Sequence, residues 1–191
     1  WFNDYDNTFD GNHFFNNSHG IFTDKMANVY VRNSRFEASS VADIVLAPSS
    51  GNSVRRCVSV GSNAFVVAPH HTGANPTTIE GCTVTGWREP PISYNLRGPL
   101  TLLDNHFLSS GTHALPAANF TPWKDTNMMV LLAGNKLDGA PASSRELCGV
   151  AASNLFTVDL PAPDGDSVAL PPSARFLKLE WPVPTSLVEA S

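Results

Sequence analysis

The sequence predicts an all-β fold of about six stacked coils, each built from three short strands, followed by an extended C-terminal segment. One short motif recurs at a nearly constant interval along the chain. The runs around it are rich in β-branched and aromatic residues, as in VYVRNSRF and TTIEGCTV, and Gly, Asn, Pro and Ser separate them. Such runs are typical of strands joined by tight turns, and a recurrent motif is typical of a repeat protein.

The motif consists of an apolar residue, two variable residues, a small polar residue or Cys, one further residue and a second apolar side chain. Its central members are Asn12, Ser34, Cys57, Cys82, Asn105 and Asn135. They follow one another after 22, 23, 25, 23 and 30 residues, and only the third copy is weak, with Ser59 at the second apolar position. This interval suits one coil of three short strands, whereas the leucine lattice of leucine-rich repeats and the long stripes of helical repeats are absent.

Each coil is expected to run from a strand before the central residue, through a short strand after it, to a third strand. The third strands are predicted to begin near Ile21, Ile44, Phe65, Ile92 and Leu115. Period-two alternation then divides each strand into inward and outward side chains. The predicted core contains Ile21, Ile44, Phe65, Ile92, Val31, Val54, Ile79, Leu102 and Leu132, and the predicted outward residues of the third strands are Phe22, Val45, Val66 and Ser93.

Over about residues 5 to 139 this coil pattern resembles the right-handed parallel β-helix proteins of the pectin-lyase-like superfamily. The resemblance implies that the recurrent Asn marks a tight turn between strands and that its amide stacks on those of adjacent coils. Asn12, Asn105 and Asn135 match that position, and the Ser and Cys residues of the middle coils interrupt the amide ladder. The stretch from Asn16 to Pro48 is similar to late coils of β-helix glycosidases such as the α-1,3-galactosidase family, whose acidic catalytic residues would lie on coils upstream of this chain.

The two ends of the chain depart from the coil pattern. Coils are expected over residues 1–139, and residues 140–191 are Pro-rich with alternating runs such as FTVDL and RFLKLEW, which predicts a capping segment of short strands. At the start, Phe9 already lies on a strand in the middle of a coil. Because an open β-helix end exposes strand edges and core side chains, we expect preceding chain or a second chain on the first coil, self-association included.

Cys57 and Cys82 occupy the same motif position on successive coils, so their backbones are expected about 5 Å apart. That distance allows a disulfide. Side chains in register on parallel strands point the same way, however, which favours two stacked thiols. Cys148 then has no partner.

Charge and composition narrow the range of partners. The 191 residues include 12 Lys and Arg against 17 Asp and Glu, for a net charge of −5, and no basic run occurs. Nucleic acid and anionic membranes are therefore disfavoured, and no apolar stretch reaches the roughly 18 residues of a spanning helix. No metal-ligand spacing is present, so no metal or cofactor is expected. A secreted, periplasmic or extracellular location is expected for a protein that acts on carbohydrate.

In β-helix polysaccharide enzymes, the resemblance implies, a substrate groove follows the outward face of the third strands. Asp24 and Asp43 are the catalytic candidates, because paired carboxylates supply the acid and the base or nucleophile of glycoside hydrolysis. Lys25 or Arg97 beside a carboxylate would instead suit proton abstraction in a lyase. The substrate-binding candidates are His19, His70, His71, Trp87, Glu89, Tyr94, Arg97 and Trp123. Their alternative roles are structural: Asp residues cap turns, the His pair forms a polar loop, and Trp side chains clamp loops to the coil.

These observations predict a carbohydrate-active enzyme, with a glycoside hydrolase favoured over a polysaccharide lyase. The alternative is a non-catalytic β-helix, either a carbohydrate-binding or adhesion module or a tailspike-like stalk. The pectate-lyase Arg motif, the Asp and Gly-His-Gly motifs of polygalacturonases and the Asp-Pro-His-Glu motif of mannuronan epimerases are absent. The sugar and the linkage therefore do not follow from the sequence.

Overall fold

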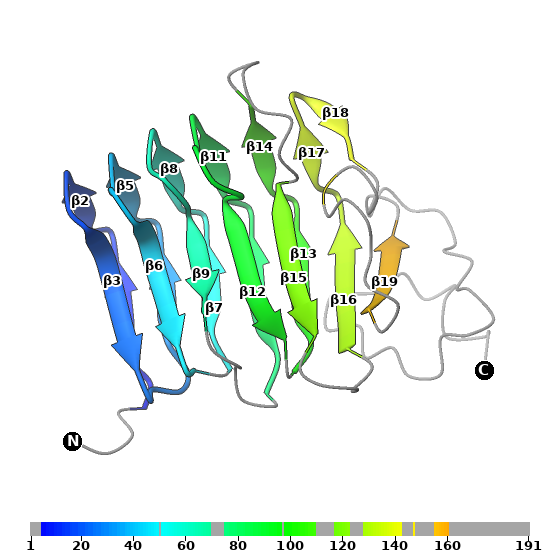
Figure 1. Cartoon of the computed structure of the whole chain (residues 1–191), viewed down its shortest axis with the longest axis horizontal. Helices are drawn as coiled ribbons and strands as arrows, with labels where there is room; N and C mark the ends of the chain where they lie inside the picture. Colours follow the sequence, from blue (N-terminus) through cyan, green and yellow to red (C-terminus); the bar gives the residue numbers. More distant parts are fainter. Residues whose placement is uncertain are drawn as a thin grey trace.

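The computed structural model describes residues 5–49, 51–69, 75–96, 98–109, 117–122, 128–142, 147 and 155–160. In this part of the chain, nineteen short strands form three sheets, and the strands of successive coils lie side by side (Figure 1). All strand pairs within the sheets are parallel except one at the C-terminal end of the second sheet. The predicted all-β class and coiled architecture are confirmed.

We name the sheets I, II and III in the order in which the chain enters them. Sheet I contains β1 (Thr8–Asp10), β4 (Tyr30–Arg32), β7 (Ser53–Arg55), β10 (Thr77–Glu80), β13 (Leu100–Leu103), β16 (Met128–Ala133) and β19 (Leu155–Leu160). Sheet II contains β2 (His13–Phe15), β5 (Arg35–Glu37), β8 (Val58–Val60), β11 (Thr83–Thr85), β14 (His106–Leu108), β17 (Lys136–Leu137) and the antiparallel β18 (Ala140–Pro141). Sheet III contains β3 (His19–Asp24), β6 (Ala42–Ala47), β9 (Val66–Ala68), β12 (Ile92–Leu96) and β15 (Ala118–Pro122).

The number of coils is smaller than predicted. Within the described residues, only five coils place a strand in all three sheets, and four full turns of chain separate β3 from β15. The strands β16 and β17 begin a further turn, which contributes to sheets I and II in the described part of the chain. In the expected C-terminal segment, β19 extends sheet I by pairing with β16, while Leu115, Cys148 and residues 161–191 lie outside the described part.

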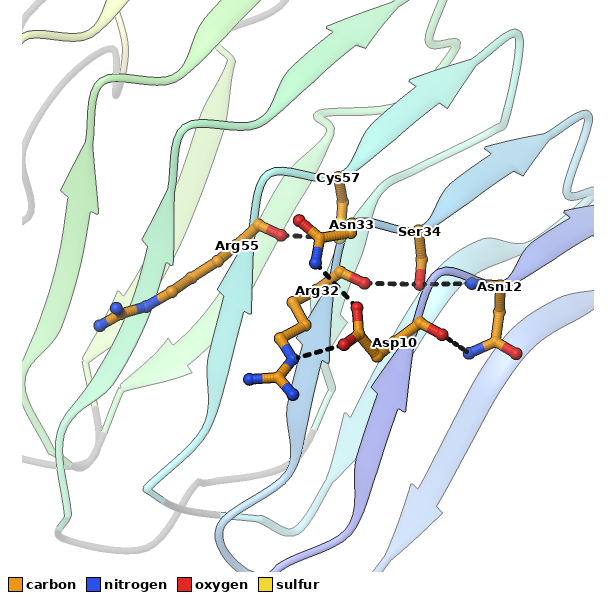
Figure 2. Close-up of polar contacts among 7 residues, drawn as sticks. All are labelled: Asp10, Asn12, Arg32, Asn33, Ser34, Arg55 and Cys57. Carbon is orange, nitrogen blue, oxygen red and sulfur yellow. Dashed lines mark hydrogen bonds and ion pairs between the residues drawn. The ribbon is translucent and has the colours of Figure 1, made fainter.

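The recurrent motif forms the predicted column at the turn between sheets I and II. Asn105 donates its side-chain amide to Asn135 Oδ1 at 3.0 Å and to the Ile79 carbonyl at 2.9 Å. At the other end of the column, Ser34 Oγ accepts a hydrogen bond from the backbone N–H of Asn12 at 3.2 Å. Figure 2 shows Asn12, Ser34 and Cys57 in one file. Ser34, Asn105 and Asn135 each accept a hydrogen bond from the backbone N–H of the preceding copy, which helps to fix the register of these coils.

Cys57 and Cys82 are both buried free thiols, as the stacked arrangement predicts. A hydrogen bond from the Cys82 thiol holds the pKa of Cys57 below its usual range. Burial raises the pKa of Cys82 well above its own usual range. In these two coils, the pair takes the place of the stacked amides.

The core lies between the three sheets. All nine residues predicted to be inward are buried: Ile21, Ile44, Phe65, Ile92, Val31, Val54, Ile79, Leu102 and Leu132. The prediction that Val66 faces outward is wrong, because Val66 is paired with Ile44 and with Ile92 and is fully buried. Phe65 precedes β9 and still lies in the turn, so two consecutive residues point inward and the alternation begins one residue later than predicted. Val67 is the actual partner of Val45 and Ser93.

Candidate functional site: a groove on the outer face of sheet I

A groove of about 430 Å³ lies on the outer face of sheet I. Alternation along β4 and β7 buries Val31 and Val54 and turns the residues on either side of them outward. The groove is lined by Thr8, Tyr30, Val31, Arg32, Ser53 and Arg55. Three consecutive coils therefore contribute to one surface.

The first outward row of this face holds one aromatic side chain between small hydroxyl residues. The register pairs Tyr30 with Thr8 on one side and with Ser53 on the other, and Ser53 with Thr78 beyond it. Because its neighbours are short, the Tyr30 ring stands above the sheet and is exposed. An aromatic face beside hydroxyl groups suits a ligand that has both apolar and hydrogen-bonding surface.

The second outward row, two residues further along each strand, is charged. The register aligns Asp10, Arg32, Arg55 and Glu80 across four coils. Arg32 Nε donates to Asp10 Oδ2 at 2.9 Å, and Arg55 Nε lies 3.2 Å from Glu80 Oε2. Figure 2 shows Arg32 against Asp10, and Arg55 extending away from this pair. In the register, the two arginines therefore occupy adjacent positions between two acidic residues.

Asp10 serves as an anchor for this row. The Asn33 side-chain amide donates to Asp10 Oδ1 at 2.8 Å, while the Arg32 guanidinium occupies Oδ2. The hydrogen bond from Asn33, followed by the charge of Arg32, lowers the pKa of Asp10. The carboxylate is therefore ionised near neutral pH and holds Arg32 in place, with the charge of Arg56 also acting on it.

The structure separates the two predicted catalytic carboxylates. Asp24 is exposed at the end of β3, where its register partner is Ala47. Asp43 is 0% exposed and points inward, with Oδ2 accepting a 2.5 Å hydrogen bond from Ser59 Oγ. The two side chains therefore do not face a common groove.

The reason lies at the start of β6. Ile44 is a core residue, and Asp43 before it contacts Ser59, whose register partners Phe36 and Val84 are also in the core. Two consecutive residues therefore point inward, at a corner where alternation does not yet hold. Burial raises the pKa of Asp43, and the nearby hydroxyls of Ser39, Ser59 and Ser62 oppose this shift. Asp43 Oδ1 has no hydrogen-bond partner among the described residues.

In its first two coils, the outward face of sheet III, where the resemblance implies a groove, carries the apolar residues Phe22 and Val45. Phe22 is exposed, and His19 lies edge-on to its ring at 5.6 Å between ring centroids. The next outward residue, Val45, is buried in a small cluster with Ala42, Ala47 and Ala64.

The other predicted substrate-binding residues are dispersed. Trp87 is buried edge-on against Phe107, at 6.3 Å between ring centroids, which agrees with its alternative structural role. Tyr94 is also buried, and its hydroxyl lies 2.9 Å from Thr77 Oγ1. Glu89 is exposed. The remaining four, His70, His71, Arg97 and Trp123, lie outside the described residues.

Sequence reasoning missed the groove, although a signal for it exists. Arg32 and Arg55 each stand two residues before a central residue of the motif, Ser34 and Cys57. The same offset in successive repeats places two side chains next to each other on the same face.

Two further features bear on the kind of site. Across the residues that the structure describes, no group of three or more His, Cys, Asp or Glu side chains is arranged to hold a metal ion. In the same ranges, no helix has the length and apolar character needed to cross a membrane.

Parallel register, a stacked turn column and a continuous core together define a parallel β-helix repeat protein. Residues 1–111 match the family model described as right handed beta helix region, and because this match covers more than half of the chain, the protein belongs to that family. No curated protein sequence matches the chain significantly, and no solved structure does so.

Proposed function

We propose that this protein is a carbohydrate-active β-helix and that the sheet I groove binds a saccharide. The observation that carries the proposal is the exposed Tyr30 ring flanked by Thr8 and Ser53, with Arg32 and Arg55 beside it. The apolar face of a sugar ring packs on an aromatic ring, and its hydroxyls pair with neighbouring donors and acceptors. Secretion or an extracellular location would give such a site access to glycans.

The family supports this proposal at the level of fold. Right-handed β-helices provide a long surface built from equivalent positions, which suits a polymer of repeating units. A fold alone does not determine a function, so the proposal depends on the groove. The likeness of residues 16–48 to β-helix glycosidases points in the same direction.

Cleavage of the glycan is a separate proposal, because the described carboxylates do not form a pair. Retaining glycosidases need two carboxyl groups about 5 Å apart, and inverting ones about 6.5 to 9.5 Å, both facing the substrate. Asp24 remains the candidate on the surface, and Asp43 lies in the core. Saccharide binding, as in the module named as the alternative, is therefore the function that the described coils support best.

The test compares two exposed aromatic residues. Tyr30→Ala should weaken glycan affinity roughly tenfold, which is about 1.4 kcal/mol, since stacking and burial of the ring are both lost. Phe22→Ala on sheet III is the control and should leave affinity unchanged. Affinity electrophoresis of the whole chain in gels that contain different polysaccharides measures both. The polysaccharide in the gel slows the migration of a protein that binds it. If Phe22→Ala abolishes this slowing and Tyr30→Ala does not, binding lies on sheet III and the proposal is refuted.

A further inference from the structure

We infer that the saccharide bound in the sheet I groove carries an acidic group, a carboxylate or a sulfate, which Arg32 and Arg55 hold between them. This inference rests on the proposed function and specifies its ligand. It concerns the outer face of sheet I, and the groove implied by the family resemblance would lie on sheet III.

The first argument is the order of charges along the row. Arg32 and Arg55 are direct register partners on adjacent strands, so their backbones are about 4.8 Å apart. Like charges opposite each other destabilise a sheet. Asp10 and Glu80 lie on the far sides of this pair, so neither carboxylate stands between the two guanidinium groups. An anion in that position would complete the row.

The second argument is the hydrogen bonding of the two guanidinium groups. Arg32 Nε donates a hydrogen bond to Asp10. Arg55 Nε donates one to Ser53 Oγ at 2.9 Å and forms an ion pair with Glu80. Among the described residues, no partner is found for the terminal nitrogens of either side chain. Each guanidinium therefore retains donors in the fork geometry that matches carboxylate and sulfate oxygens.

The third argument is accessibility. The two side chains are 51% and 52% exposed, so a ligand reaches them from solvent. Their contacts to carboxylates at the base of each guanidinium restrict their rotamers before the ligand arrives, which lowers the entropy cost of binding. The chain has a net charge of −5, so its overall charge does not attract anions. An anion would be attracted by the two arginines alone.

The fourth argument is the position of Tyr30 relative to the arginines. Tyr30 and Arg32 are two residues apart on the same face of β4, which is about 6.6 Å along the strand. The distance from the centre of a sugar ring to the oxygens of an exocyclic acidic group, plus the length of one hydrogen bond, is similar. A ring stacked on Tyr30 thus brings its acidic substituent to the two guanidinium groups.

The experiment uses two matched pairs of probes, which distinguish the two sources of the oxyanion. One pair is an oligogalacturonate and its methyl ester, and the other is a sulfated galactan oligosaccharide and the same compound after desulfation. Calorimetric titration of the whole chain should show at least tenfold tighter binding of the acidic member in one pair. The pair that shows the difference identifies the group as carboxylate or sulfate.

The arginine variants locate the effect. Arg32→Gln and Arg55→Gln should each reduce affinity for the acidic probe about tenfold and leave affinity for its neutral partner unchanged. Arg35→Gln on sheet II is the matched control, because Arg35 is 49% exposed and is also paired with a carboxylate, Glu37. It should change neither affinity.

Three results would overturn the inference. Equal affinity for the acidic and neutral members of both pairs would show that the acidic group does not contribute to binding. The proposal that the groove binds a saccharide would still stand. An equal loss in Arg35→Gln would show that only net charge matters. Failure of every probe to bind, with far-UV circular dichroism unchanged, would refute the proposed function and the inference with it.

Discussion

Replacing Asp43 by Asn should stabilise the protein at neutral pH and remove part of its pH dependence. The carboxyl group is fully buried, only Oδ2 has a hydrogen-bond partner, and burial raises its pKa. A buried charged group with one unpaired oxygen costs about 1 to 3 kcal/mol, and the amide carries no charge. The hydroxyls of Ser39, Ser59 and Ser62 are able to rotate and accept its N–H groups.

The direction with pH follows from the raised pKa. In the unfolded chain, the Asp43 carboxyl group has its ordinary pKa of 3.8. Below that pH the group is protonated in both the folded and the unfolded state, so it causes no loss of stability. As the pH rises through that value and then through the higher folded pKa, the unfolded state releases its proton first, so stability falls. Above the folded pKa the loss is complete. Wild type should therefore approach the Asp43→Asn variant in stability at about pH 3 and fall below it at pH 7.

Urea unfolding followed by circular dichroism at several pH values measures this difference, expected to be about 1 to 3 kcal/mol at pH 7. Asp24→Asn, on the exposed end of β3, is the control and should stay within about 0.5 kcal/mol of wild type. An Asp43→Asn variant that is less stable than wild type at pH 7, with the same slope against pH, would refute the reasoning. That result would mean that the serine hydroxyls compensate the ionised carboxylate fully.

Three other substitutions test the packing of the coils. Ile79→Ala removes a fully buried side chain and should cost about 2 to 5 kcal/mol in urea unfolding, and a loss below about 1 kcal/mol would contradict its place in the core. Asn105→Ala should cost about 1 to 3 kcal/mol, because the Ile79 carbonyl and the Asn135 side chain each lose a buried partner, and amide exchange should rise first at this turn. Gly20→Ala should also destabilise, since a Cβ atom there would lie 2.7 Å from the Asp43 carbonyl oxygen and from a ring carbon of Phe36, and unchanged unfolding would show that this corner adapts.

The sequence was sufficient for the turn column and the core because both depend on features that repeat. Asn105 and Asn135 occupy equivalent tight turns in adjacent coils. The burial of Ile79 follows from its position three residues before Cys82, the turn residue of its own coil. The register of sheet III was less predictable, because the turns that lead into its strands vary in length. One extra inward residue before β9 was enough to turn Val66 from the surface to the core.

The candidate site was less predictable than the fold. Asp43 follows a corner, and no pattern in the sequence shows that its side chain turns inward to Ser59. The pairing of Arg32 and Arg55 was available from their offset to the recurrent motif. The groove that the family resemblance implies lies instead on the outward face of sheet III.

The most direct test of the account is a crystal structure of this chain with a bound acidic oligosaccharide. We expect one sugar ring on the Tyr30 side chain and oxygens of one acidic group within about 3 Å of terminal nitrogens of both Arg32 and Arg55. An oligosaccharide along the outer face of sheet III, over Phe22 and with the sheet I groove empty, would contradict it.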